Sequence, residues 1–287
     1  MKILKGLSIF FLFVVLFGSC FDPPEYSVVP QIEYNDIEYV EGSPFDTLIL
    51  KIDFKDGDGD LGLNTDVNSD NYDINPPYNS TFYFLEDGTG ELTKVPTYLR
   101  YSNLPPSFIE PNSENQGKLV TIRTRNKPGY GSLPYPYSCK DYIYTSLYVS
   151  EENASLFDET YNIIDTLKSV SQPDVYVLKD TFYYELNPQH YNIDIDFLIR
   201  NTDGSGTYTE FDWNTLDCGT TFNGRFPVLT DKPRVVEGTL TYNMTSIGFL
   251  QLFSVKVMKL RIRVRDRALN ESNVIETPDF TLNDIRR

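Results

Sequence analysis

The sequence predicts an all-β protein made of antiparallel sheets, and three observations support this fold class. Apolar and polar residues alternate along several segments, which is typical of strands that bury one face. Gly, Pro, Asn and Asp gather between these segments, where they favour turns. Only residues 154–170 have the apolar spacing of a helix. Many short strands separated by turns are typical of an antiparallel β-sandwich.

The three clearest strands are predicted at residues 47–54, 192–199 and 258–264. The last of them has an apolar face and a cationic face, the latter formed by Lys259, Arg261, Arg263 and Arg265. We expect this cationic face to be solvated and paired with acidic neighbours such as Asp194 and Asp196, rather than to bind an anion. Further strands are predicted near residues 32–40, 81–85, 119–124, 142–149, 175–184, 208–213 and 238–242.

Composition excludes several classes of protein. The chain has 287 residues, 41 of them acidic and 25 basic, and a formal net charge of −16. This charge argues against a nucleic-acid partner, which needs a basic face for its phosphates. The single histidine, His190, cannot build a multi-histidine metal site. The sequence has no Gly-x-Ser-x-Gly elbow, zinc His-Glu-x-x-His motif or phosphate-binding Gly-rich loop followed by Lys, so we expect no enzyme.

The first twenty residues predict export and lipidation. Lys2 and Lys5 precede an apolar run at residues 7–17, and two small residues follow before Cys20. This order is typical of a secretory signal peptide, and the run is too short to span a bilayer comfortably. The cysteine after Gly-Ser resembles the lipobox of bacterial lipoproteins, which implies cleavage before Cys20 and acylation of that residue. An ordinary signal peptide followed by a chance Cys is the alternative.

The length after the signal suits one large or two ordinary domains. A strand that runs into an Asp/Gly turn occurs twice, at residues 52–59 and 195–206, which favours two similar sandwiches. Chance similarity is the alternative, because such turns often follow strands. The predicted organisation is a signal peptide at residues 1–19, a lipidated Cys and tether at 20–30, a first sandwich at 31–150, a linker or short helix at 151–172, and a second sandwich at 173–287.

Two motifs carry a family resemblance. FKDGDGDLG at residues 54–62 and RDRALNES at residues 265–272 resemble segments of Bacteroidetes-type lipoproteins with immunoglobulin-like β-sandwich domains. RDRALNES resembles the Asp-x-Ala-Gly-Asn-x-Ser turn before the last strand of many bacterial immunoglobulin-like domains, with Leu269 at the glycine position. The resemblance implies two tandem immunoglobulin-like domains and a lipid anchor in the outer membrane.

Asp56, Asp58 and Asp60 alternate with glycines in one short run and form a candidate calcium site. Carboxylates spaced in this way can converge on a hard cation, and their mutual repulsion favours one. The run is not an EF-hand loop, because Leu61 and Val67 stand where that loop needs Gly and Glu. A solvated acidic turn is the alternative. Four further carboxylates could complete the site, namely Asp53, Asp66, Asp70 and Asp73.

Cys139 and Cys218 remain if Cys20 is lipidated, which leaves an even number of thiols in an oxidising compartment. A bridge between them would close a long loop and stabilise the fold by roughly 4 kcal/mol if it were unstrained. Two buried free thiols are the alternative.

Tyr130, Tyr135 and Tyr137 form the third candidate site, a loop in which the tyrosines stand among Gly and Pro. Loop tyrosines are adaptable contact residues, so they could meet a glycan or a protein partner. Packing of these rings across a domain junction is the alternative.

Together these features predict a cell-envelope lipoprotein that acts as a non-enzymatic binding or scaffolding module through loops at one end of a sandwich. The loop after the second strand and the loop before the last strand lie at the same end of such a fold. We therefore expect residues 56–60 and Asp266 at equivalent ends, although in different domains. The partner would be an unknown envelope protein or glycan. The alternatives are a glycan-capturing accessory lipoprotein of a polysaccharide uptake system and, third, an envelope hydrolase that uses paired carboxylates.

Overall fold

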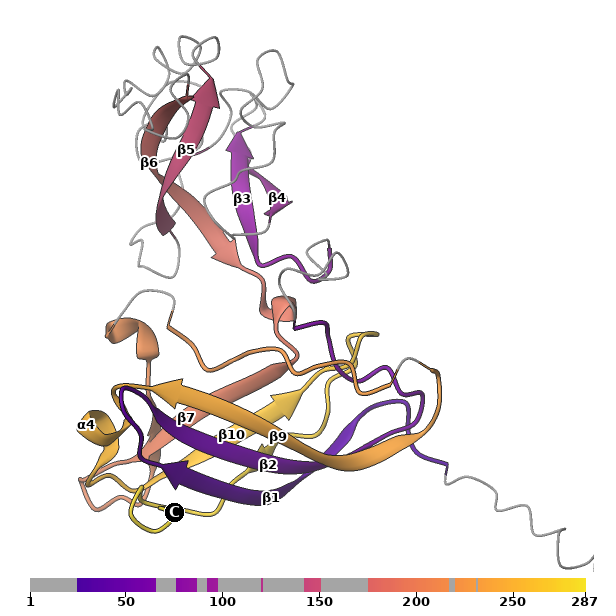
Figure 1. The fold of residues 1–287 in the computed structure, drawn as a ribbon, viewed down its shortest axis with the longest axis vertical. Coiled ribbons are helices and arrows are strands. Elements are labelled where there is room, and N and C mark those ends of the chain that lie inside the picture. Colours follow the sequence, from indigo (N-terminus) through magenta and orange to yellow (C-terminus); the bar gives the residue numbers. More distant parts are fainter. Residues whose placement is uncertain are drawn as a thin grey trace, which may run out of the picture.

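The computed structural model describes residues 25–65, 76–86, 92–97, 120, 142–150, 175–216, 220–230 and 232–287. These residues form mainly antiparallel strands, which confirms the predicted all-β class. Figure 1 shows a sandwich of two sheets and a smaller sheet that projects from one side of it. None of the helices in the described ranges has the length and apolar character needed to cross a bilayer.

The first sheet of the sandwich has the strand order β1-β2-β9, with β1 at Gln31–Val40, β2 at Asp46–Asp56 and β9 at Val236–Ser246. In β2, buried positions alternate with partly exposed ones, as the period of the sequence predicts. β2 pairs with β9 along its whole length, from Asp46 opposite Ser246 to Asp56 opposite Val236. Two segments far apart in the sequence are therefore neighbours in one sheet.

The second sheet has the strand order β11-β10-β7-β8. Its members are β7 at Ile193–Arg200, β8 at Tyr208–Glu210, β10 at Met258–Val264 and β11 at Ile275–Glu276. The register places Arg261 of β10 opposite Asp196 of β7, and Arg263 opposite Asp194. β7 and β10 are the interior strands of this sheet, and each points one face into the sandwich.

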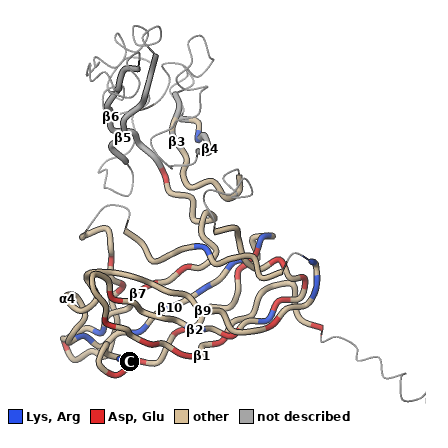
Figure 2. The backbone as a smooth tube through the Cα atoms, in the orientation of Figure 1, with Lys and Arg blue, Asp and Glu red and all other residues tan. Residues whose placement is uncertain are grey.

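The cationic face of β10 is paired with acidic side chains, which confirms the expectation from the sequence. Arg261 lies 2.7 Å from Asp196, and Arg263 lies 3.2 Å from Asp194. Lys259 lies 2.5 Å from Glu276 on the neighbouring strand β11. Figure 2 shows basic and acidic residues interspersed in this way over the sandwich. Because these pairs are partly exposed, each contributes little to stability, and their main effect is charge balance.

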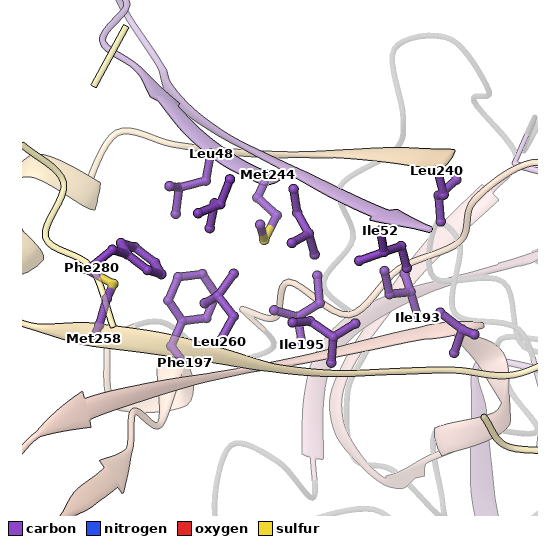
Figure 3. Packing of buried hydrophobic residues seen from close by; sticks show 14 of the residues in the cluster. Leu48, Ile52, Ile193, Ile195, Phe197, Leu240, Met244, Met258, Leu260 and Phe280 are labelled. Atoms are coloured by element: carbon purple, nitrogen blue, oxygen red, sulfur yellow. The ribbon is translucent and has the colours of Figure 1, made fainter. Parts of the chain in front are cut away.

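One hydrophobic core lies between the two sheets. Figure 3 shows Leu48 and Met244 of the first sheet above Phe197 and Leu260 of the second. All four side chains are at most 2% exposed. One part of the core is aromatic and centres on Phe197; its ring neighbours are Trp213, Phe222, Phe249 and Phe253. Burial of these apolar surfaces is the main force that holds the sheets together.

This shared core differs from the expected division of the chain. Residues 31–150 and 173–287 were expected as separate sandwiches, yet β1 and β2 pack with β7, β9 and β10 in a single sandwich. The two similar strand-and-turn units belong to β2 and β7, which face each other across the same core. Alternation shows that a strand buries one face, but it does not show which strand lies opposite. For this reason the repeat suggested two cores, whereas the described strands of the sandwich share one.

The segment between β2 and β7 adds a separate sheet with the order β4-β3-β6-β5. Its strands are β3 at Thr81–Glu86, β4 at Leu92–Thr97, β5 at Tyr142–Ser150 and β6 at Val175–Leu186. The chain leaves and re-enters the sandwich at one place, where the Asn187 side-chain amide donates to the carbonyls of Pro77 (2.6 Å) and Asn79 (2.8 Å). These bonds fasten the two crossing segments to each other.

Candidate functional site

A tight loop follows β2 and carries three aspartates, Asp56, Asp58 and Asp60. Gly59 adopts a φ of 74°, in the left-handed region that favours glycine. A Cβ atom at Gly59 would also lie 2.4 Å from the carbonyl oxygen of Arg234. The glycine therefore lets the backbone turn closely enough to bring the carboxylates to the end of the sandwich.

A second loop, after β10, meets the first one. The backbone N–H of Arg267 donates to the carbonyl of Asp60 (3.2 Å), and the N–H of Ala268 donates to Asp60 Oδ2 (3.0 Å). Leu269 has a φ of 67°, so it takes the left-handed conformation that glycine adopts easily. The two loops lie at the same end, as expected from the sandwich rule, but within one sandwich rather than in two domains.

Three aspartates converge where these loops meet. Asp56, Asp60 and Asp266 each offer a carboxylate oxygen within 4.8 Å of the other two. Asp56 and Asp266 are 0% and 1% exposed. Both oxygens of Asp266 are held by Asn270, through its backbone N–H and its side-chain amide, each at 2.8 Å. The carboxylate of Asp266 is thus fixed in place while its remaining lone pairs stay available to a ligand.

Two oxygens of this cluster, and one of the neighbouring Asp58, have no hydrogen-bond partner among the described residues. These are the buried Oδ1 atoms of Asp56, Asp58 and Asp60. Asp56 Oδ2, by contrast, accepts from the N–H of Leu61 at 3.2 Å. A buried carboxylate oxygen without a partner loses its hydration and gains nothing in return, so it is costly. A bound cation would remove that cost.

The electrostatics of the cluster also favour a bound cation. Burial, together with the charges of Asp266, Asp58 and Asp56, raises the pKa of Asp60 to about 6. Burial, then the charge of Asp58, also raises the pKa of Asp56. The Arg267 guanidinium donates to the carbonyls of the glycine loop rather than to a carboxylate. In the described part of the chain, none of the ion pairs includes an aspartate of this cluster.

Asp53, expected as a further ligand, does not join the cluster. It lies three residues before Asp56 on β2, an odd spacing that places it on the opposite face of the strand. There it accepts from Asn35 at 2.9 Å and from Thr239 at 2.5 Å. Asp266 was not predicted as a ligand, because its loop was expected in a different domain from Asp56 and Asp60. Its signal was the RDRALNES motif, whose loop lies at the same end as the glycine loop.

The remaining candidates lie outside the described residues. They are Cys20 with the signal peptide, Asp66, Asp70 and Asp73, the tyrosines Tyr130, Tyr135 and Tyr137, the pair Cys139 and Cys218, and the linker at 151–172. The lipid anchor, the disulfide and the tyrosine contact loop therefore stay predictions.

His190 supports the base of the inserted sheet. Its Nδ1 lies 2.8 Å from the carbonyl oxygen of Tyr78, and Arg225 donates to the same carbonyl at 3.0 Å. Burial lowers the pKa of His190 to about 4, so the ring is neutral at pH 7. The hydroxyl of Tyr78 in turn donates to the carbonyl of Arg267 in the loop after β10. The single histidine thus connects the crossing segments with the end of the sandwich that carries the aspartates.

Comparison with known proteins gives no assignment of function. No protein-family model matches the chain, and no match was found among the curated proteins or the solved structures.

Proposed function

We propose that this chain is a non-enzymatic binding module of the cell envelope, and that a bound Ca²⁺ ion holds its loop end in shape. The observation that supports this most is the convergence of Asp56, Asp60 and Asp266, with buried oxygens that have no partner among the described residues. Calcium prefers carboxylate and carbonyl oxygens, whereas zinc and copper favour His or Cys ligands, which this cluster lacks.

In this proposal the ion has a structural role. It would neutralise the repulsion among the aspartates and tie the loop after β2 to the loop after β10. Loops at one end of a sandwich commonly form the binding surface, because a rigid scaffold holds them. A loop end that is fixed before a partner arrives loses less conformational entropy on binding.

The strand order supports an immunoglobulin-like arrangement. Strands β1, β2 and β9 would correspond to A, B and E of that fold, and β7, β8, β10 and β11 to C, C′, F and G. The inserted sheet would then replace the loop between the second and third strands of the sandwich. We propose one immunoglobulin-like sandwich with an insertion.

The proposed envelope location rests on the signal sequence and on Cys20 as the lipid anchor. The segment that follows the anchor reaches the acidic end of the sandwich, where the N–H of Gly57 donates to the carbonyl of Ser27 at 2.9 Å. The proposed cation site would therefore lie on the side of the sandwich from which the tether leaves.

The lipid anchor is tested by metabolic labelling. In a bacterial host that processes lipoproteins, the full chain is expected to incorporate labelled palmitate and to fractionate with membranes. Cys20→Ala is expected to abolish the label, because the acyl chains are attached to this residue. Ser19→Ala keeps a small residue before the cut and serves as the control. A labelled Cys20→Ala variant, or an unlabelled full chain, contradicts the proposal.

The calcium site is tested by titration calorimetry on the full chain in detergent, after treatment with a chelator. We expect one Ca²⁺ site, and at least a tenfold loss of affinity in Asp56→Asn. Asp53→Asn is the matched control: it changes the same residue type on the same strand, but on the opposite face. The proposal fails if millimolar Ca²⁺ gives neither binding heat nor a shift in melting temperature. It also fails if both variants weaken binding equally.

A further inference from the structure

Two adjoining hollows lie along β7, close to the base of the inserted sheet. Their volumes are about 400 and 370 Å³. Pro188, Asp196 and Asn223 line both of them, and the two adjoining hollows are together termed the β7 groove. Volumes of this order are typical of sites that hold a small molecule or one unit of a longer ligand.

The first hollow combines aromatic and polar side chains. It is lined by four aromatic residues and three carboxylates, namely Tyr191, Phe197, Phe211 and Trp213, and Asp196, Glu210 and Asp212. Among the described residues that line it, none is Lys or Arg. The second hollow does contain Arg261 and Arg263, but both guanidinium groups are paired with carboxylates of the protein. Arg261 pairs with Asp196 and Glu210 of the first hollow, so the charges of the described residues around both hollows are largely balanced and offer little attraction to an anionic ligand.

A fixed donor and a fixed acceptor lie where the two hollows join. Asn223 Oδ1 accepts from the N–H of Ile195 at 2.8 Å, which orients the amide and leaves its Nδ2 as the donor for a ligand. Asp196 Oδ2 accepts from Arg261 Nε at 2.9 Å, which leaves its Oδ1 as the acceptor. A hydroxyl group can donate to one and accept from the other, whereas an ammonium group can only donate. The pair therefore favours a hydroxylated ligand over an amine.

The sheet topology argues against a peptide strand as the ligand. β7 lies between β10 and β8, and β8 pairs with residues 198–200 of β7. Beside the groove, other residues cover this edge: Gly224 exchanges two backbone hydrogen bonds with Ile193, and the N–H of Ile195 donates to Asn223 Oδ1. A peptide that binds by strand addition needs a free sheet edge. The β7 groove offers side chains instead, and its partly exposed rings, Tyr191 and Phe211, supply apolar surface for the carbon face of a sugar ring.

We propose that the β7 groove binds a neutral oligosaccharide. Asp196 and Asn223 would hold hydroxyl groups where the hollows join, and the aromatic side chains of the first hollow would contact the ring of one sugar unit. Two adjoining hollows suit a ligand of at least two units. The inference rests on the proposed role as a binding module, but it does not require the calcium ion.

The chain contains one tryptophan, Trp213, and this residue lines the groove, so intrinsic fluorescence reports binding there. The full chain in detergent is titrated with neutral hexasaccharides of β1,4-glucose, β1,3-glucose, α1,4-glucose, β1,4-xylose and β1,4-mannose, and calorimetry follows any response. We expect saturable binding of at least one of them. Asn223→Asp is expected to weaken it at least tenfold, because the variant keeps the acceptor for Ile195 but replaces the donor with a second carboxylate oxygen.

Asn243→Asp is the matched control, since it adds the same charge on the exposed side of β9 in the other sheet. It is expected to bind like the unmodified chain. If Asn223→Asp has a lowered melting temperature, Tyr191→Ala replaces it as the variant that removes ring contact. The proposal is overturned if none of the neutral sugars binds, or if both groove variants bind normally. If hexagalacturonate or a decapeptide binds more tightly than the neutral sugars, and Asn223→Asp weakens that binding, the assignment of a neutral sugar as the ligand is wrong.

Calcium binding is measured on the same samples. Calcium binding without sugar binding removes only the groove inference and leaves the calcium proposal in place. Sugar binding without calcium binding removes the calcium proposal and leaves the groove inference in place. The two failures are therefore distinguishable.

Discussion

Replacing Phe197 with Ala is expected to lower the free energy of unfolding by about 3–5 kcal/mol. The Phe197 ring is 1% exposed and lies 5.0 Å from the Trp213 ring, centroid to centroid, in an edge-to-face arrangement. Phe249 and Phe253 stack on it at 6.1 and 5.9 Å. Truncation therefore leaves a cavity among rigid rings, which close in on an empty space only partly. Urea unfolding followed by tryptophan fluorescence measures the change.

Phe45→Ala is the control for this experiment. Its side chain is 55% exposed, so the same truncation is expected to cost less than about 0.5 kcal/mol. Equal costs for the two variants would contradict the assignment of Phe197 to the centre of the shared core. Two separate unfolding transitions for the strands of the sandwich would contradict the single core itself.

Replacing Asp60 with Asn is expected to raise the stability of the fold in the absence of calcium and to lower it in the presence of calcium. In excess chelator at pH 7 the variant should be more stable than the unmodified chain, by on the order of 1 kcal/mol once solvent screening is allowed for. The amide removes one of several crowded charges, and its oxygen can still accept from Ala268. In calcium the variant should be less stable, because ion binding at 100 times the dissociation constant contributes about 2.7 kcal/mol.

Thermal unfolding in calcium and in chelator measures this reversal. Asp53→Asn serves as the comparison, because its side chain bonds to Asn35 and Thr239 and lies outside the cluster. Its effect on the melting temperature is expected to be the same in both buffers. If Asp60→Asn destabilises the chain equally in calcium and in chelator, the carboxylate has a purely structural role and no ion is held there.

The sequence was most informative where local pattern alone decides the structure. The alternation in residues 47–54, 192–199 and 258–264 predicted β2, β7 and β10 to within a few residues, because a strand that buries one face must alternate. The pairing of Arg261 and Arg263 with acidic neighbours followed from the same reasoning. Asp56 and Asp60 were found because alternating carboxylates in a glycine loop form a local signal.

The errors concern long-range pairing, which local pattern does not encode. Nothing near β2 in the sequence shows that β9 is its partner, so the chain appeared to divide in the middle. Asp266 could be recognised as part of the cluster only after both loops were placed in one sandwich. Asp53 was included by proximity in sequence, although its position on β2 already points it to the other face. The β7 groove depends on residues from several segments and left no local signal.

The pairing of β2 with β9 also sets the order in which the molecule can fold. β1 and β2 leave the ribosome early, with Leu48 and Leu50 on an apolar face that has nothing to cover it. Their partners β7, β9 and β10 are synthesised only after the whole inserted sheet. Contacts between residues so far apart in the chain make folding slow, and exposed apolar strands are prone to aggregate meanwhile. Until the last third of the chain has been synthesised, the apolar face of the N-terminal hairpin therefore lacks the strands that cover it in the folded molecule.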